Sequence, residues 1–130
     1  MIVNERAILA LTPNADHTDK EGFFIELSSG AASIVNSAAD LPYGLILDGE
    51  TTNGKDTIAL CAAFSGIVTV KVTDTAPGTI AAGVIGTVKS DGTVQADAGS
   101  GARVQVCQFL EAGVANELVK AVLLRPVALS

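Results

Sequence analysis

The strongest constraint on the fold is an alternation of apolar and polar residues that turn signals interrupt at short intervals. In Ile67–Thr73, read as IVTVKVT, three valines point to one side of an extended chain, and Thr69, Lys71 and Thr73 point to the other. The stretch Ala102–Gln108 repeats this arrangement. Such alternation is typical of a strand with one buried and one exposed face, so both stretches predict half-buried strands.

The run Leu118–Arg125 is more continuously apolar, which favours a central strand buried on both faces. Weaker alternation marks six further candidate strands: Arg6–Leu11, Phe23–Leu27, Ala32–Asn36, Tyr43–Asp48, Thr57–Phe64 and Val84–Lys89. The positions expected to face the core are Val68, Val70, Val72, Ala102, Val104, Val106 and Val122.

The turn signals fit a chain of antiparallel hairpins. In VKSDGTVQ (88–95), two half-apolar runs flank Asp91-Gly92, and we expect Gly92 to adopt a positive φ that closes a hairpin. The spacing between turns is mostly too short for crossover helices. Gly30–Asp40 is compatible with a short helix, although Ile34-Val35 argues against it. The fold class predicted is all-β, a small single-domain β-barrel or β-sandwich.

Composition narrows the class of partner. Apolar residues make up 48% of the 130 residues, charged residues 17% and aromatic residues 4%, so the core is built from small aliphatic side chains. A short supply of charge favours burial of part of the surface against copies of the chain or another protein. The net charge of −6, with eight scattered basic residues, disfavours nucleic-acid binding. We expect no membrane span, because no apolar run approaches ~20 residues.

Two polar stretches and one glycine-rich loop are candidates for binding sites. Asp48, Glu50, Asn53 and Asp56 could offer oxygen ligands to calcium, but their spacing misses the EF-hand pattern, which favours a solvated hairpin loop. The Gly99-Ser100-Gly101 loop could present amides to an anion, but no following helix or nearby lysine supports this, so we interpret it as a connection.

Candidates for catalysis are few. His17, Asp19 and Glu21 alternate as an acid–base group might, but their polar surroundings predict exposure and ordinary acidity. Cys61 and Cys107 lie in apolar runs and are expected to be buried free thiols. A zinc site would need more ligands than these cysteines and His17 provide. We therefore expect neither an enzyme nor a cofactor.

The first 20 residues differ from the rest, because a short apolar run precedes a polar segment containing Pro13. We interpret residues 1–20 as a candidate extended N-terminal arm and residues 21–130 as the β-rich domain. Burial against another subunit would offset the entropy cost of ordering such an arm. The residues expected to make an oligomer or capsid contact are Ile8, Leu9 and Leu11.

The C-terminal half resembles a known family. The phrases GIVTVKV, GTIAAGVIGTV, SDGTV and ARVQVCQFLEAGVANELVKAVLL, within about residues 60–125, are similar to small capsid decoration proteins of tailed bacteriophages, also called capsid cement or head fibre proteins. At Asn116 this chain departs from a glycine that is common in the family, although Asn also tolerates positive φ. Residues 1–59 carry little of the resemblance.

The resemblance implies a structural protein of the virion, made in the cytoplasm of the bacterial host, that stabilises or decorates the outside of a capsid. Its partners would be the major capsid protein and its own copies, with a homotrimer the natural match to three-fold positions. An alternative is a small-molecule- or carbohydrate-binding β-barrel with an aromatic-lined cavity. The aromatic residues are few for that role: Phe23, Phe24, Tyr43, Phe64 and Phe109.

Overall fold

The computed structural model describes residues 7–52, 54–63 and 66–130, and these residues form strands and turns without a helix. The all-β prediction is therefore confirmed, and the candidate helix at Gly30–Asp40 is wrong, because its first part is a strand. The strands are β1 (Ile8–Leu11), β2 (Phe24–Ser28), β3 (Ala31–Ile34), β4 (Gly44–Thr52), β5 (Lys55–Leu60), β6 (Ile67–Lys71), β7 (Ile85–Val88), β8 (Val94–Ala96), β9 (Arg103–Phe109) and β10 (Leu118–Leu129).

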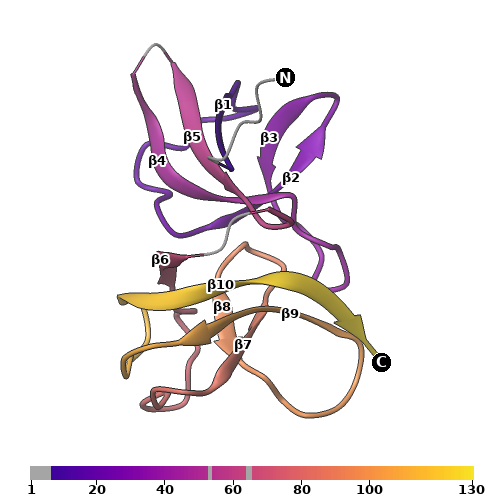
Figure 1. Cartoon of the computed structure of the whole chain (residues 1–130), viewed down its shortest axis with the longest axis vertical. Helices are drawn as coiled ribbons and strands as arrows, with labels where there is room; N and C mark the ends of the chain where they lie inside the picture. The colour runs from indigo at the N-terminus through magenta and orange to yellow at the C-terminus, as the bar shows by residue number, and fades with distance from the viewer. Residues whose placement is uncertain (1–6, 53, 64–65) are drawn as a thin grey trace, which may run out of the picture.

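The ten strands form two five-stranded sheets with the same topology. The order is β1-β5-β4-β2-β3 in one sheet and β6-β10-β9-β7-β8 in the other, and every strand pair is antiparallel. Figure 1 shows the first sheet in the upper half and the second in the lower half. The chain thus repeats one architecture twice, although its sequence carries no evident repeat.

Each sheet curls until the chain after its first strand meets its last strand. Pro13 forms a parallel bridge with Ala32, and Val72 forms the equivalent bridge with Val94. Asn14 and Ala32 both donate amide hydrogen bonds across the first closure, at 2.9 and 2.8 Å, and Thr73 donates to Val94 at 2.9 Å across the second. We call residues 7–63 the N-barrel and residues 66–130 the C-barrel.

The C-barrel has the alternating burial that its sequence predicts. On β6, Val68 and Val70 are buried and Thr69 is exposed. On β9, Val104, Val106 and Cys107 are all fully buried. The adjacent burial of Val106 and Cys107 arises at a register shift, because β9 pairs with β7 through Cys107 and Gln105 but not through the residue between them.

Four sequence-based expectations in the C-barrel are wrong. Thr73, expected on the exposed face of its strand, is buried and lies beyond the end of β6. Ala102 is exposed and precedes β9. β10 lies between β6 and β9 in its sheet, but only one of its faces is buried. The residues on that face are Val119, Ala121 and Leu123. Val122 therefore lies on the outer, half-buried side together with exposed Lys120. In the continuous apolar run, the sequence does not show which positions face the core, and only Lys120 indicates the outer side.

The predicted hairpin at residues 88–95 joins β7 to β8. The Lys89 amide donates to the Thr93 carbonyl at 2.8 Å, and the Gly92 amide donates to the Lys89 carbonyl at 3.0 Å. Gly92 has φ +82°, as expected, and Asn116 also adopts a positive φ, +67°, which an asparagine tolerates. The turn contacts the N-barrel, because the Phe24 amide donates to the Gly92 carbonyl at 2.9 Å.

The apolar core has two parts. A small cluster fills the N-barrel, with Ile25, Ala32, Ile46 and Ile58 fully buried. A larger cluster fills the C-barrel and continues into the N-barrel through five residues on the opposite face of the first sheet. Strands β2, β4 and β5 are therefore buried on both faces. The five residues that join the barrels are Phe24, Val35, Leu45, Ala59 and Cys61.

Candidate interaction surfaces

Strand β1 carries the residues predicted to contact an oligomer or a capsid. Ile8 is 40% exposed, whereas Leu9 and Leu11 are half-buried. Leu11 packs against the small N-barrel cluster, and β1 pairs with β5 along its whole length. Residues 8–11 thus form an edge strand of the N-barrel, and Ile8 is the large apolar side chain that this strand exposes. Residues 1–6 of the candidate arm lie outside the described residues, and contact with another subunit stays a prediction.

His17 and Asp56 form a buried pair in the N-barrel. The prediction that His17 is exposed is therefore wrong. The side chains of His17 and Asp56 are 2% and 0% exposed, and Nδ1 of the histidine lies 2.5 Å from Oδ2 of the aspartate. The chain packs tightly around this pair, since a Cβ on Gly49 would lie 2.0 Å from the His17 carbonyl oxygen. Asp19 and Glu21 are exposed, as predicted, so the three residues do not form one group.

The candidate calcium loop does not gather its carboxylates. Asp56 is engaged with His17, and Asp48 is half-buried on β4. Asn53 and the side chain of Glu50 lie outside the described part of the chain. Within that part, no group of three or more His, Cys, Asp or Glu residues is placed to hold a metal ion.

The glycine-rich loop binds a carboxylate of its own chain. Gly99 and Gly101 both have positive φ, and the Gly99 amide donates to Asp97 Oδ1 at 3.0 Å. Arg103 Nε donates to the same oxygen, and Gln105 Nε2 donates to Oδ2 at 2.7 Å. These bonds, first of all that from Gly99, hold the pKa of Asp97 below its ordinary value. The loop is therefore a connection that hydrogen bonds to Asp97 hold in one conformation.

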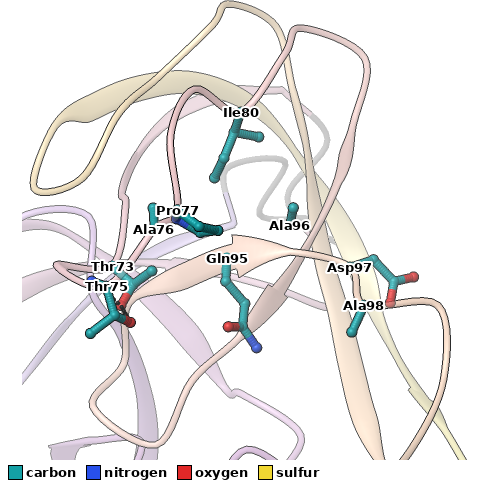
Figure 2. A pocket seen from close by; sticks show the side chains of 9 residues that line it. All are labelled: Thr73, Thr75, Ala76, Pro77, Ile80, Gln95, Ala96, Asp97 and Ala98. Carbon is teal, nitrogen blue, oxygen red and sulfur yellow. Dashed lines mark hydrogen bonds between the residues drawn. The ribbon is translucent and has the colours of Figure 1, made fainter.

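A cavity of about 300 Å³ opens beside β8 (Figure 2). The loop that follows β6 forms one wall, and the segment from Gln95 to Ala98 forms the other. Lys89 Nζ donates to the hydroxyls of Thr73 and Thr75, at 3.2 and 2.8 Å, and so fixes the start of the loop. The lining residues are Thr73, Thr75, Ala76, Pro77, Ile80, Gln95, Ala96, Asp97 and Ala98, none of them aromatic.

The cavity forms where the barrel closure ends. Alternate residues of an antiparallel strand direct their backbone groups to the neighbouring strand. Asp97 donates its amide to Ile85 of β7, so Ala96 directs its amide and carbonyl away from β7, towards the cavity. The chain after Thr73 turns away instead of pairing with Ala96, because the Thr75 amide bonds to the Thr73 hydroxyl at 3.3 Å. No sequence pattern marked this cavity.

Cys61 and Cys107 are buried free thiols, as predicted. Both belong to the larger core cluster, one from the end of β5 and one from β9. Burial raises the pKa of each thiol to about 12, so both are protonated at neutral pH. Protonated, buried thiols are poor nucleophiles, which leaves them a packing role.

The outer face of β6 and β10 is apolar and basic. Antiparallel partners point to the same face, and the register pairs Ile67 with Val122, Thr69 with Lys120, and Lys71 with Leu118. Ile67 is 64% exposed and Leu118 is 45% exposed. Leu110 lies beside this face, because its amide donates to the Lys120 carbonyl at 2.9 Å. We call Ile67, Thr69, Lys71, Leu110, Leu118, Lys120 and Val122 the β6–β10 face.

Comparison of the chain with known protein families and with curated proteins finds no match. Over the described ranges, no helix is long and apolar enough to cross a membrane.

Proposed function

We propose that this protein is a structural protein of a bacteriophage virion that binds the outside of the capsid as a homo-oligomer and stabilises it. The observation that carries the proposal is the extent of the resemblance to capsid decoration proteins. The resembling stretch, about residues 60–125, corresponds closely to the C-barrel, a complete structural unit, rather than to scattered fragments.

The fold suits such a role for physical reasons. A continuous core that joins the two barrels makes one stiff body. A body that binds only the assembled shell shifts the equilibrium towards that shell by mass action. Repetition of the site over a capsid makes modest contacts effective. The contacts we expect on the N-barrel are Ile8, Leu9 and Leu11 of β1.

The position of the gene and a binding assay test the proposal. We expect the gene beside those for a protease or scaffold and a major capsid protein. We also expect the purified protein to co-sediment with shells assembled from the capsid protein encoded there, and to raise their disassembly temperature. A gene in an unrelated operon, or a protein that stays in the supernatant at saturating concentration, would contradict the proposal.

The cavity beside β8 favours a second candidate, a ligand-binding module. Its volume of about 300 Å³ is at the lower limit for small-molecule sites. Its lining lacks the aromatic side chains on which sugars stack, which favours a small aliphatic ligand over a carbohydrate. Thermal shift measurements with short-chain aliphatic acids and with monosaccharides would test this candidate, which requires a rise in melting temperature with one of the former.

A further inference from the structure

The β6–β10 face is an exposed apolar surface that the N-barrel covers only at one edge, where the Lys71 amide donates to the Gly22 carbonyl at 3.0 Å. Ile67 is the most exposed large apolar residue among those described, at 64%, and Leu118 and Leu110 are exposed at 45% and 44%. On the opposite side of the same strands, Val68, Val70, Val119 and Ala121 form the core. Aliphatic side chains grouped on the outer side of a sheet are typical of a protein–protein contact.

The charge of this face is opposite to that of the rest of the molecule. Its strand positions carry Lys71 and Lys120 and no carboxylate, while Glu111 lies at the rim and accepts the Lys120 amide at 3.0 Å. Residues 64–130 carry five acidic and five basic side chains, whereas residues 1–63 carry nine acidic and three basic side chains. The whole net charge of −6 therefore belongs to the first half of the chain.

The N-barrel offers an acidic surface that is also apolar, at the start of β4. Leu41 is 59% exposed and Tyr43 is 38% exposed. Tyr43 donates its amide to the Ile25 carbonyl at 2.8 Å, which places it next to Glu26 on β2. Glu26 in turn shares a hydrogen bond with Asp40. We call Glu26, Asp40, Leu41 and Tyr43 the β2–β4 surface.

We propose that the β6–β10 face of one copy docks against the β2–β4 surface of a second copy, with Lys120 directed at the paired carboxyl groups of Glu26 and Asp40. Ile67 and Leu118 then cover Leu41 and Tyr43 of the neighbour. Burial of these aliphatic and aromatic groups supplies the attraction, and the complementary charges set the orientation. The inference deepens the homo-oligomer of the proposed function and rests on it.

This contact joins two different surfaces of the same chain, so it is heterologous. Each copy then uses one surface to bind the copy before it and the other to bind the copy after it. Contacts of this kind close into rings when the rotation between copies allows it. A ring of three satisfies both surfaces of every copy and suits the three-fold positions expected for a decoration protein.

Charge reversal and rescue on the full-length protein test the contact, with sedimentation velocity as the readout. We expect wild type to self-associate, and Lys120→Glu to raise the dissociation constant by about tenfold or more. Glu26→Lys alone should weaken association as well, and the double variant should recover most of the loss. The matched control is Lys55→Glu, at the tip of the β4–β5 hairpin, at the opposite end of β4 from Tyr43. It makes the same change of charge and should leave association unchanged.

Thermal melts of every variant separate loss of contact from loss of fold. A monomeric wild type at all concentrations, or a double variant no better than the worse single variant, would overturn the inference. So would an Ile67→Glu variant that associates like wild type. Binding of the same variants to capsid shells is measured separately. If Lys120→Glu still self-associates but no longer binds shells, the face contacts the capsid, which refutes this inference and supports the proposed function.

Discussion

The N-barrel and the C-barrel share one strand order, but their strands are buried differently. In the C-barrel, β6 and β10 have one buried and one outer face, and on β6 apolar residues alternate with polar ones. In the N-barrel, β2, β4 and β5 separate two core clusters, and neighbouring residues such as Phe24 and Ile25 are both fully buried. The same topology therefore produces two different sequence patterns, because the pattern records burial and not strand order.

Polar contacts differ between the barrels in the same way. The N-barrel holds the His17–Asp56 pair in the interior, and the C-barrel holds the ion pair Asp97–Arg103 near the surface, with the side chains 16% and 15% exposed. The N-barrel also carries the net negative charge. The N-barrel is thus the half in which loss of a single partner should cost most.

The largest expected effect follows removal of β1. Deleting residues 1–14 removes the strand that pairs with β5 and the residues that close the N-barrel through Ala32. Because the N-barrel shares its core with the C-barrel, we expect the whole domain to lose its cooperative thermal transition. Deleting residues 1–6 is the control and keeps every described strand. A protein that stays folded without residues 1–14 would show that the N-barrel does not need closure.

The His17–Asp56 and Asp97–Arg103 pairs give the next comparison. His17→Ala leaves the buried Asp56 carboxyl without its histidine, and we expect a loss of about 3–5 kcal/mol in the free energy of unfolding. Arg103→Ala removes a partly exposed partner of Asp97, and the expected loss is below about 1 kcal/mol. Urea denaturation measures both. Equal losses would mean that the His17–Asp56 pair is hydrated in solution.

Alanine substitutions at two hairpin glycines distinguish the energetic cost of a positive φ from that of a steric clash. Gly30, between β2 and β3, and Gly92, between β7 and β8, have φ values of +80° and +82°. Gly30→Ala adds a Cβ in open space, so it should cost about 1–2 kcal/mol, the penalty of left-handed backbone. Gly92→Ala also places Cβ 2.7 Å from Ile34 and 3.0 Å from the Phe24 carbonyl, which should add about 1–3 kcal/mol. Similar melting temperatures for the two variants would contradict the close contact between the barrels.

The smallest expected effects are opposite in sign and depend on pH. The pKa of Asp97 is lowered from 3.8, first by the Gly99 amide, so its stabilisation is present above that value and is lost as pH falls through the folded pKa. The pKa of Glu26 is raised from 4.5 by burial and by Asp40, so its contribution is present at low pH and is lost as pH rises through the folded pKa.

Asp97→Asn should therefore destabilise the protein at pH 7, and Glu26→Gln should stabilise it, each by less than about 1 kcal/mol at these partly exposed sites. Both differences should shrink when unfolding is measured near pH 3. A change of the same sign in the two variants would refute the opposed roles of these carboxyl groups.

The sequence by itself determined the local structure. Alternation located β6 and β9, and the signal Asp91-Gly92 located the β7–β8 turn and the positive φ of Gly92. The buried thiols followed from their apolar surroundings. In each case the decisive interaction lies within a few residues, so the sequence contains the whole cause.

Only the tertiary structure decided what depends on residues far apart in the chain. His17 is buried beside Asp56, 39 positions later, whose carboxyl group is hydrogen-bonded to Nδ1 of the imidazole ring, and nothing near His17 in the sequence indicates this. The outward direction of Val122 follows from pairing with Ile67, and the cavity beside β8 from the point where Thr73 leaves Val94. The closure of both barrels, and the core that joins them, likewise arise from packing between distant segments. A local sequence pattern indicates whether a residue is apolar enough to be buried. Which distant segment packs over that residue is determined only when the two sheets assemble.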